Sequence, residues 1–327
     1  MTEVLDPTLS VPIDFGDFVR QREQSFATRV EGGVPDYAFS WDWTIRRQLD
    51  AIGPLRWLAE AMCAGTVPVQ RAMQEANAVA VGPDQFPQVH AMGVRCAETL
   101  GIGIPQLFIM QEPRVNAFTF ATGEVDQIVV LTSGLLETCD STELLTVIGH
   151  ECGHIHNRHV VYNTLWEVLT NDLARGLLTQ VLAKLGRSSL VISLIDMVFT
   201  VAVKGIFMRW HRCAEITCDR AGLICAGDVE ASKRLHGKLA MGHIGQMEGF
   251  NSEAYKHQLK TFSKSAMKIM ELFLSHPLGP VRAQAIEAFL DCETLHGWRP
   301  ELRTAPARPR AEVDDEIGFR RRDPGQS

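Results

Sequence analysis

The sequence predicts an α+β protein that is predominantly helical and has a small β-sheet ahead of a helix with the motif HExxH. Three observations support this fold class. Apolar residues recur at helical spacing through most of the chain, three short β-favouring runs lie between residues 106 and 131, and a capping signal opens the helix that carries His150 and His154. The chain shows no internal repeat.

The composition is that of a globular protein with a mildly acidic surface. Of the 327 residues, 46% are hydrophobic and 22% are charged, which excludes a disordered or collagen-like chain. The 32 Lys and Arg residues against 39 Asp and Glu residues give a net charge of −7. A protein that binds nucleic acid through bulk charge needs a basic face, so we expect no nucleic-acid partner. The length allows one large domain or two ordinary ones.

The cysteine pattern indicates the redox compartment. Eight cysteines are scattered along the chain without a CxxC pair, unlike the dense framework of a small secreted protein. The first twenty residues lack the basic segment and apolar run of a signal peptide. We therefore predict reduced, mostly buried thiols and a cytoplasmic protein, with membrane association left open.

The first 80 residues are predicted to form an arm followed by a helical extension. Residues 1–35 are polar, acidic and rich in turn formers. Between Trp41 and Ala80 the apolar spacing fits amphipathic helices, and Gly82-Pro83-Asp84 breaks that pattern. The segment His90–Leu100 has the pattern of another helix, which ends at Gly101.

Residues 81–295 are predicted to form the main domain, and residues 296–327 a disordered tail. The β-favouring runs are Gln106–Met110, Ala117–Ala121 and Gln127–Leu131. Helices are expected over Ser141–Tyr162, Val168–Leu185, Leu190–Phe207, Cys213–Ala226 and Val281–Leu290. The first of these opens on a capping box, in which Asp140 is followed three residues later by Glu143. From Arg299 onward the chain has several prolines, mixed charges and no apolar period, which favours disorder.

One apolar segment, Leu190–Met208, raises the question of a membrane. Asp196 and Lys204 interrupt it, whereas a spanning helix needs about 20 nearly uninterrupted apolar residues. A central Asp costs about 2.5 to 3.5 kcal/mol on insertion. We favour a buried core helix over a peripheral contact with a membrane or partner, and a true span is the weakest of the three alternatives.

The strongest chemical signal is His150-Glu151-Cys152-Gly153-His154. Residues i and i+4 share one face of a helix, so both imidazoles can reach a single zinc ion. Glu151 lies next to that face, where it can hold and deprotonate a water molecule activated by the metal. Because a chance HExxH is uncommon and the helical context fits, we interpret the motif as a zinc site rather than as unrelated histidines.

The third ligand decides the class of zinc site. The metzincin pattern requires Gly and His at positions that here hold Asn157 and Val160, so that class is rejected. A later helical segment offers Glu215 and Asp219, which are i and i+4. Glu215 would ligate the metal, and Asp219 could accept the second N–H of a ligand histidine and fix its tautomer.

Together these residues resemble the M48 zinc metallopeptidases, a family that includes the HtpX-type and CAAX-processing proteases and soluble bacterial relatives. The resemblance covers about residues 80 to 290, and it rests on Asn116-Ala117-Phe118, Thr132-Ser133-Gly134-Leu135-Leu136, Glu143-Leu144, the HExxH segment, Glu215 with Asp219, and Ser275-His276-Pro277. It implies a gluzincin-like fold, one zinc ion per chain held by His150, His154 and Glu215, and endopeptidase activity on a protein or peptide substrate.

The chain also departs from the family pattern. HtpX-type and CAAX-processing members carry clear transmembrane helices, so this chain is more similar to the soluble members. Cys218 stands where the family often has a small residue or alanine before its conserved Asp. Its thiol could be an extra soft ligand, although a small buried residue is the interpretation we favour, as it is for Cys152.

The remaining motifs are assigned roles by the resemblance. Asn116, Ala117 and Phe118 open a strand that, in related zinc proteases, pairs with the substrate backbone. His276 and Arg282 would reach the site and stabilise the oxyanion or support the ligands, with His276 the main candidate. His156 and His159 lie off the face shared by the ligands, and we expect structural roles for them.

We therefore predict a zinc-dependent endopeptidase in which Glu151 acts as general base and then passes its proton to the leaving amine. Two alternatives stay open. One is a latent or inactive chaperone or adaptor that the metal stabilises, and the other is a regulatory protein recruited to a membrane through Leu190–Met208.

Overall fold

A computed structural model describes residues 30–31, 34–122, 125–164, 204–241, 251, 254 and 279–317. The chain divides into two compact units, Met1–Asp36 and Tyr37–Ser327. In the first unit, strands β1 (Val30–Glu31) and β2 (Val34–Pro35) pair antiparallel. The functional residues all belong to the second unit.

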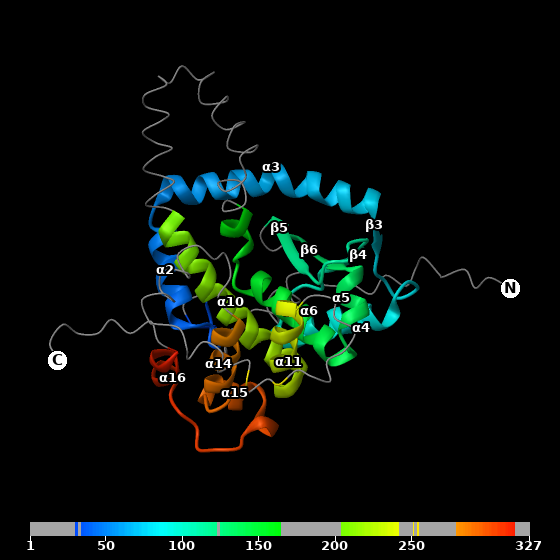
Figure 1. Ribbon diagram of the computed structural model, residues 1–327. Helices are drawn as coiled ribbons and strands as arrows, with labels where there is room; N and C mark the ends of the chain where they lie inside the picture. Colours follow the sequence, from blue (N-terminus) through cyan, green and yellow to red (C-terminus); the bar gives the residue numbers. More distant parts are fainter. Residues whose placement is uncertain are drawn as a thin grey trace, which may run out of the picture. The chain divides into compact units, whose positions relative to one another are not determined.

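A mixed four-stranded sheet forms the β part of the second unit (Figure 1). Its strands are β3 (Ala78–Ala80), β4 (Gln106–Met110), β5 (Ala117–Thr122) and β6 (Val125–Thr132), in the order β3-β4-β6-β5. Strand β6 pairs parallel with β4 and antiparallel with β5, where Thr119 lies opposite Val129. The three predicted β runs are thus confirmed, β3 is an addition, and β5 is an edge strand.

Most of the described residues are helical, as the sequence predicts. The helices are α2 (Ser40–Asp50), α3 (Gly53–Asn77), α4 (Pro87–Leu100), α5 (Ser133–Thr138), α6 (Ser141–His156), α10 (Lys204–Ala226), α11 (Val229–Met241), α14 (Gly279–Phe289), α15 (Glu293–Trp298) and α16 (Arg310–Glu316), with a 3₁₀ turn at Pro300–Leu302. Helix α6 ends at His156, six residues before the predicted end at Tyr162. The predicted helix Val168–Leu185 and most of Leu190–Phe207 lie outside the described residues.

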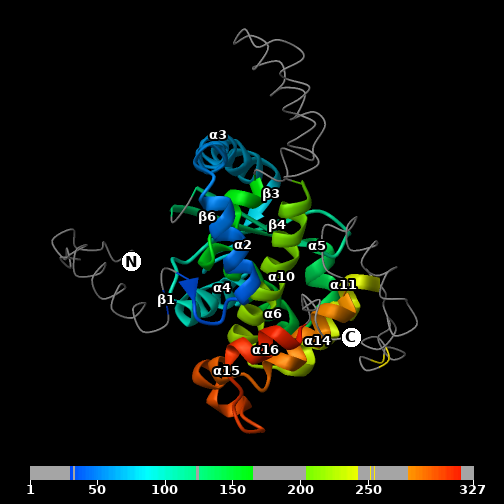
Figure 2. The ribbon, with the colours of Figure 1, turned by 90° about the vertical axis from the view of Figure 1, so that its left-hand side faces the viewer.

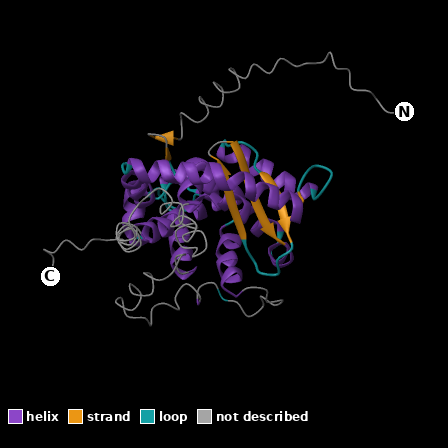
Figure 3. Cartoon of the chain, turned by 90° about the horizontal axis from the view of Figure 1, so that it is seen from above, coloured by secondary structure: helices purple, strands orange, loops and turns teal. Residues whose placement is uncertain are grey.

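Helices cover both faces of the sheet, and the alternation along β6 shows why. Ile128 and Val130 pack with Cys63 and Val67 of α3 on one face. Val129 and Leu131 belong to the core on the other face, which includes Leu144, Leu145 and Ile148 of α6 together with α4 residues. Seen from above, α3 crosses the strands (Figure 3). The sheet is therefore buried between α3 and the helix that carries HExxH.

Helix α6 begins at a complete capping box, as predicted. The Asp140 side chain accepts hydrogen bonds from the backbone N–H groups of Thr142 and Glu143, each at 2.9 Å. The Glu143 carboxylate in turn accepts one from the Asp140 N–H at 2.9 Å. Glu143 is fully buried and is paired with Lys238 of α11 at 2.5 Å. The start of α6 is thus fixed both locally and to α11.

Two glycines of α6 allow this helix to pack very close to α10. Gly149 directly precedes the HExxH motif, and Gly153 lies within it. A Cβ built on Gly149 would lie 2.6 Å from the Cys225 Cβ, and one on Gly153 would lie 2.7 Å from the Ala221 Cβ. Real side chains do not tolerate such separations. This close contact places the middle of α10, with Glu215 and Asp219, directly against the zinc-motif face of α6.

The segment after Asp36 belongs to the same compact unit as α6, so that unit begins earlier than the predicted boundary at residue 80. Helix α2 runs beside α10 (Figure 2). Phe39, Ile45 and Leu49 are buried in a core cluster with Trp210 of α10. Residues 37–50 are thus part of the scaffold of the site.

The tail differs from the predicted disorder. Residues 299–317 are ordered and include α16, in which Val313 and Asp314 are buried. The Asp314 carboxylate pairs with Arg220 of α10 at 2.5 Å and accepts a hydrogen bond from the Ser40 N–H at 2.9 Å. The polar composition of α16 therefore reflects a buried ion pair rather than an unfolded segment.

The structure also bears on the predicted thiols and on the apolar segment Leu190–Met208. All eight cysteines are free thiols, and all but Cys139 are buried, as predicted. Residues 190–203 of the predicted apolar segment lie outside the described residues, and Lys204–Met208 form the start of α10. Among the helices that the structure describes, none combines the length and apolar character needed to cross a membrane.

Candidate metal centre and active site

The HExxH residues lie on the buried face of α6, one turn apart. Glu151 and His154 are buried, and the His150 side chain is 12% exposed. The two imidazole rings have their centroids 5.0 Å apart and are nearly perpendicular. The helical spacing therefore brings the two histidines together as predicted.

Helix α10 places Glu215 between the two rings. Its carboxylate oxygens lie 3.6 Å from Nε2 of His150 and 3.4 Å from Nε2 of His154. Ligand atoms about 2.0 to 2.2 Å from a tetrahedral zinc ion are separated from one another by about 3.3 to 3.6 Å. The two distances belong to different oxygens, Oε2 toward His150 and Oε1 toward His154, so the Glu215 carboxylate spans the two imidazoles, and each nitrogen–oxygen separation lies in the range of two ligands of one ion.

Asp219 lies one turn further along α10 and is bound to the opposite nitrogen of His150. The Asp219 carboxylate is 3.0 Å from His150 Nδ1, so it accepts the Nδ1–H, and Nε2 is the ring nitrogen on the side of Glu215. This is the predicted relationship.

Arg282 of α14 clamps the two carboxylates of α10. Its guanidinium donates to Asp219 through Nε at 2.7 Å and Nη2 at 2.5 Å, and it pairs with Glu215 through Nη1 at 3.0 Å. Of the two roles predicted for Arg282, at the oxyanion or in support of the ligands, its position against the Glu215 and Asp219 carboxylates favours the second. His276, the other residue predicted there, lies outside the described residues.

The charges of the site act on one another strongly. Burial of Asp219 opposes ionisation, but the charges of Arg282 and His236 and hydrogen bonds from Arg282 and His150 hold its pKa well below the usual value. Burial likewise opposes protonation of His154, but its hydrogen bond to Glu215 and the Glu215 charge raise its pKa. The cleft thus gathers three carboxylates, of Glu151, Glu215 and Asp219, around one guanidinium, that of Arg282.

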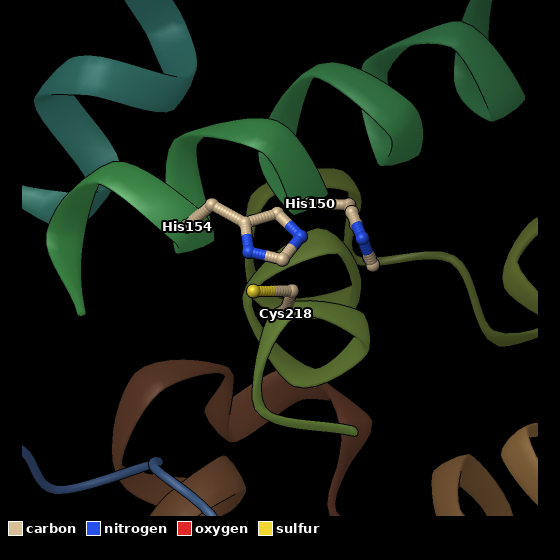
Figure 4. Close-up of side chains that lie close together, drawn as sticks. All are labelled: His150, His154 and Cys218. Carbon is tan, nitrogen blue, oxygen red and sulfur yellow. The ribbon is translucent and has the colours of Figure 1, made fainter. Parts of the chain in front are cut away.

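Cys218 is the other candidate ligand, because its sulfur and one nitrogen each of His150 and His154 lie within 4.8 Å of one another. Figure 4 shows the sulfur beside the His154 ring nitrogen nearest the backbone, while the other ring nitrogen points toward His150. The sulfur also lies 3.4 Å from Nδ1 of His159, which in turn contacts Nδ1 of His154. Burial raises the pKa of the thiol well above its usual value. The Nε2 side of His154 therefore faces Glu215, and the Nδ1 side faces Cys218.

Glu151 is held by a residue that the sequence analysis did not single out. The Thr119 hydroxyl of β5 donates a 2.6 Å hydrogen bond to Oε2 of Glu151. Thr119 alternates with Phe118 and Phe120, whose rings stack on each other at 6.2 Å. The period of two along β5 could have indicated that Ala117 and Thr119 share a face, but it does not say which face meets α6.

Two further histidines, His159 and His236, join the site. His236 of α11 lies 3.2 Å from the Asp219 carboxylate and has its other nitrogen 2.7 Å from the Ser232 carbonyl. His159, for which a structural role was predicted, contacts His154 directly at 3.2 Å. Neither contact has a local sequence signal, since both depend on how separate segments pack.

These residues border a cleft of about 620 Å³ between β5 and helices α6, α10, α11 and α14. Its lining includes His150, Glu151, His154, Glu215 and the predicted substrate segment Asn116–Phe118. The structure therefore brings the predicted metal ligands, the predicted base and the predicted substrate strand to one cavity.

Comparison with known proteins decides the family. The sequence pattern of peptidase family M48 matches residues 83–290, which include every site residue from Asn116 to Arg282. The chain belongs to peptidase family M48. The M48 resemblance predicted over about residues 80 to 290 is thereby confirmed.

Similar M48 proteins occur in plants and bacteria. The plastoglobule-localized metallopeptidase 48 of Arabidopsis thaliana chloroplasts is 29% identical over 219 residues, which cover 64% of this chain and 59% of that protein. Protease HtpX of Xanthomonas euvesicatoria pv. vesicatoria is 29% identical over 210 residues, covering 59% of this chain and 69% of that protein. The match thus spans less than two thirds of the plant relative's length. No solved structure matches this M48 chain significantly.

Proposed function

We propose that this M48 chain is a zinc-dependent endopeptidase with one zinc ion held by His150, His154 and Glu215 in a gluzincin-like arrangement. The observation that carries the proposal is the placement of the Glu215 oxygens, 3.6 and 3.4 Å from the two Nε2 atoms. On the far side of His150, Nδ1 faces Asp219 at 3.0 Å. Two imidazoles and a carboxylate are a donor set that zinc prefers.

The residues of the chain have distinct roles in this proposal. When bound, zinc supplies a Lewis acid that acidifies water and polarises a carbonyl group. Glu151 takes a proton from the attacking water and delivers it to the leaving amine. Thr119 orients the Glu151 carboxylate, and Arg282 orients Glu215 and Asp219 as a positioning residue. The role of His276 at the oxyanion stays a prediction.

Edge strand β5 is the proposed binding site for the substrate backbone. It pairs with β6 on one side only, and its first residues line the cleft beside Glu151. An extended peptide can add to such an edge through main-chain hydrogen bonds, which makes recognition tolerant of side-chain identity. We therefore propose unfolded or extended segments of protein as the substrate class.

The metal site is tested first by elemental analysis of the purified full chain. We expect about one zinc per chain in wild type and loss of zinc in His150→Ala and in Glu215→Gln. Cys218→Ala is the matched control from the same helix, and it should keep its zinc. Retention of zinc by Glu215→Gln together with its loss from Cys218→Ala would replace Glu215 by Cys218 as the third ligand.

The activity is tested with casein as an unstructured substrate, with and without a chelator. Glu151→Gln should lose nearly all activity while keeping its zinc, because the base is removed and the ligands remain. Equal proteolysis by wild type and Glu151→Gln would contradict the mechanism. Stoichiometric zinc without any cleavage by wild type would favour the alternative of a metal-stabilised adaptor.

A further inference from the structure

A buried row of polar groups connects helix α2 to the ligand His154. Nδ1 of His154 lies 3.2 Å from Nδ1 of His159, and Nε2 of His159 lies 2.9 Å from Oδ2 of Asp42. The Thr217 hydroxyl donates to the same Asp42 oxygen at 2.7 Å. His159 is 0% exposed and Asp42 is 2% exposed, so solvent does not compete for these contacts.

The donors and acceptors along this row indicate which ring nitrogens of His159 and His154 carry a proton. An ionised carboxylate only accepts, so the His159 Nε2 that faces Asp42 carries a proton. In the neutral ring the lone pair then lies on Nδ1, which faces Nδ1 of His154 at 3.2 Å and Sγ of Cys218 at 3.4 Å. The Nδ1–H of His154 can donate to this lone pair at 3.2 Å, a shorter contact than that of the neighbouring Cys218 thiol at 3.4 Å. In that tautomer the lone pair of His154 lies on Nε2, which faces Glu215 at 3.4 Å.

The turn after α6 builds this contact from the backbone. The His159 N–H donates to the His154 carbonyl at 2.9 Å, and the Arg158 N–H donates to the Ile155 carbonyl at 3.0 Å, which is a Schellman motif. Arg158 takes the left-handed conformation, with φ of 56°, at the position where glycine is usual. The motif turns the chain back so that His159 returns to the ring of His154.

Packing then holds His159 and Asp42 in place. The His159 ring meets Trp210 of α10 edge to face at 5.6 Å between centroids. The Phe39 N–H donates to the Thr217 hydroxyl at 3.1 Å, so the start of α2 is bound to α10 next to Asp42. Both ends of the row are therefore supported by α10, the helix that carries Glu215.

The buried row of polar groups lowers the stability of the fold, which argues against a purely structural role for Asp42. Oδ1 of Asp42 is buried and has no hydrogen-bond partner among the described residues. A buried polar atom without a partner destabilises the folded state. Apolar residues in place of Asp42, His159 and Thr217 together would join α2 to α10 without this cost.

We propose that Asp42 is a positioning residue for the metal site, acting through His159 to hold His154 with Nε2 toward the ion. The inference rests on the proposed metal site. It extends that site to α2, because Asp42 lies before the residues that the M48 family pattern matches. Asp219 has the corresponding position at the other proposed ligand, because it contacts Nδ1 of His150 without an intervening group.

The test measures zinc affinity of the full chain by competition with a chromophoric chelator, alongside thermal unfolding of the metal-free protein. Asp42→Asn should weaken zinc binding by about 10-fold or more, the usual effect of losing an outer partner of a ligand histidine. The matched control is Asp314→Asn, which removes another buried carboxylate that contacts the start of α2 but no ligand. We expect it to destabilise the metal-free protein and to leave zinc affinity unchanged.

A second pair of variants keeps the test decisive if Asp42→Asn does not fold. Thr217→Val removes the hydroxyl that orients Asp42, and Thr217→Ser retains it. Weakened zinc binding in the Val variant, restored in the Ser variant, supports the proposal. Wild-type affinity in Asp42→Asn or in Thr217→Val overturns the proposal but leaves the metal site intact. Absence of zinc from wild type would overturn the metal site and the inference together.

Discussion

The Thr119 hydroxyl on β5 donates a hydrogen bond of 2.6 Å to Oε2 of Glu151 on α6. That length is typical of a hydroxyl bound to a charged carboxylate. The bond joins the strand that we propose holds the substrate to the group that we propose moves the proton. The bond helps to fix the position of strand β5 relative to the Glu151 carboxylate on α6.

Thr119→Val should therefore lower kcat with little effect on zinc content. A hydrogen bond to a charged group contributes about 1.5 to 3 kcal/mol, so we expect a loss of about 10-fold or more. Thr119→Ser keeps the hydroxyl and should retain most of the activity. Steady-state cleavage of a peptide, with elemental analysis of each variant, provides the measurement. A Val variant with the wild-type kcat would show that the bond does not orient the base.

Removal of Arg282 should destabilise the metal-free protein more than the zinc-loaded one. Its guanidinium forms ion pairs with both buried carboxylates, Glu215 and Asp219, and helps to hold the pKa of Asp219 well below its usual value. Loss of one partner of a buried ion pair costs about 3 to 5 kcal/mol. Zinc would place positive charge beside the same carboxylates, so it should recover part of the loss in Arg282→Gln.

Thermal unfolding with zinc and with a chelator gives the comparison. Arg234→Gln is the control, because Arg234 is 39% exposed and pairs with Asp140 and Glu143 away from the ligands. We expect a loss of at most about 1 kcal/mol for this more exposed residue, independent of zinc. An Arg282→Gln variant whose loss is the same in both conditions would contradict the charge argument.

Arg158→Gly should stabilise the chain. The position has φ of 56°, which costs a residue with a Cβ about 1 to 2 kcal/mol and costs glycine little. Arg158→Ala is the control, because it loses the same side chain but keeps the Cβ. Urea unfolding should show a higher free energy of unfolding for Gly than for Ala. Equal stability of the two variants would mean that the turn stores no strain at this residue.

The cap of α6 should depend on pH in the acid range. Burial of Asp140 opposes ionisation, but hydrogen bonds from the Glu143 and Thr142 N–H groups and the Arg234 charge lower its pKa below 3.8. A lowered pKa in the folded state stabilises the protein above the unfolded value, and this contribution is lost as pH falls through the folded value. The charge contribution of Asp140 should therefore be constant near neutrality and should fade below about pH 4.

Asp140→Asn separates the charge from the cap, because Asn caps helices as well as Asp does. Its stability difference from wild type in urea should shrink as the pH is lowered from 5 toward 3. Asp140→Ala loses the cap itself and should cost about 1 kcal/mol at neutral pH. A difference between wild type and Asn that is unchanged on acidification would contradict the charge contribution.

Local patterns were enough to predict the elements that carry the site. The capping box marked the start of α6, and the i, i+4 spacings placed His150 with His154 and Glu215 with Asp219. These relationships are internal to a helix, or they follow from chemistry that requires the groups to meet. The direct contact between Asp219 and His150 was predicted on that chemical ground.

The remaining parts depend on contacts between distant segments. Asp42 and His159 are 117 residues apart in sequence, and no local pattern connects a helix near the N-terminus to the end of α6. Arg282 was predicted to reach the site, but its two carboxylate partners could be identified only from the packing of α14. The prolines, mixed charges and missing apolar period after Arg299 predict disorder, because a sequence does not reveal that Asp314 of α16 forms a buried ion pair with Arg220.

The glycine contacts between α6 and α10 have a consequence for how the centre would receive its metal. Because a Cβ on Gly149 or Gly153 would collide with atoms of α10, these glycines let the helix of the histidine pair lie very close to the helix of Glu215. A cation at the proposed site would therefore meet ligands that are already held close together. A substitution that adds volume at Gly149 or Gly153 should push α10 away from α6 and widen the proposed site without replacing a proposed ligand.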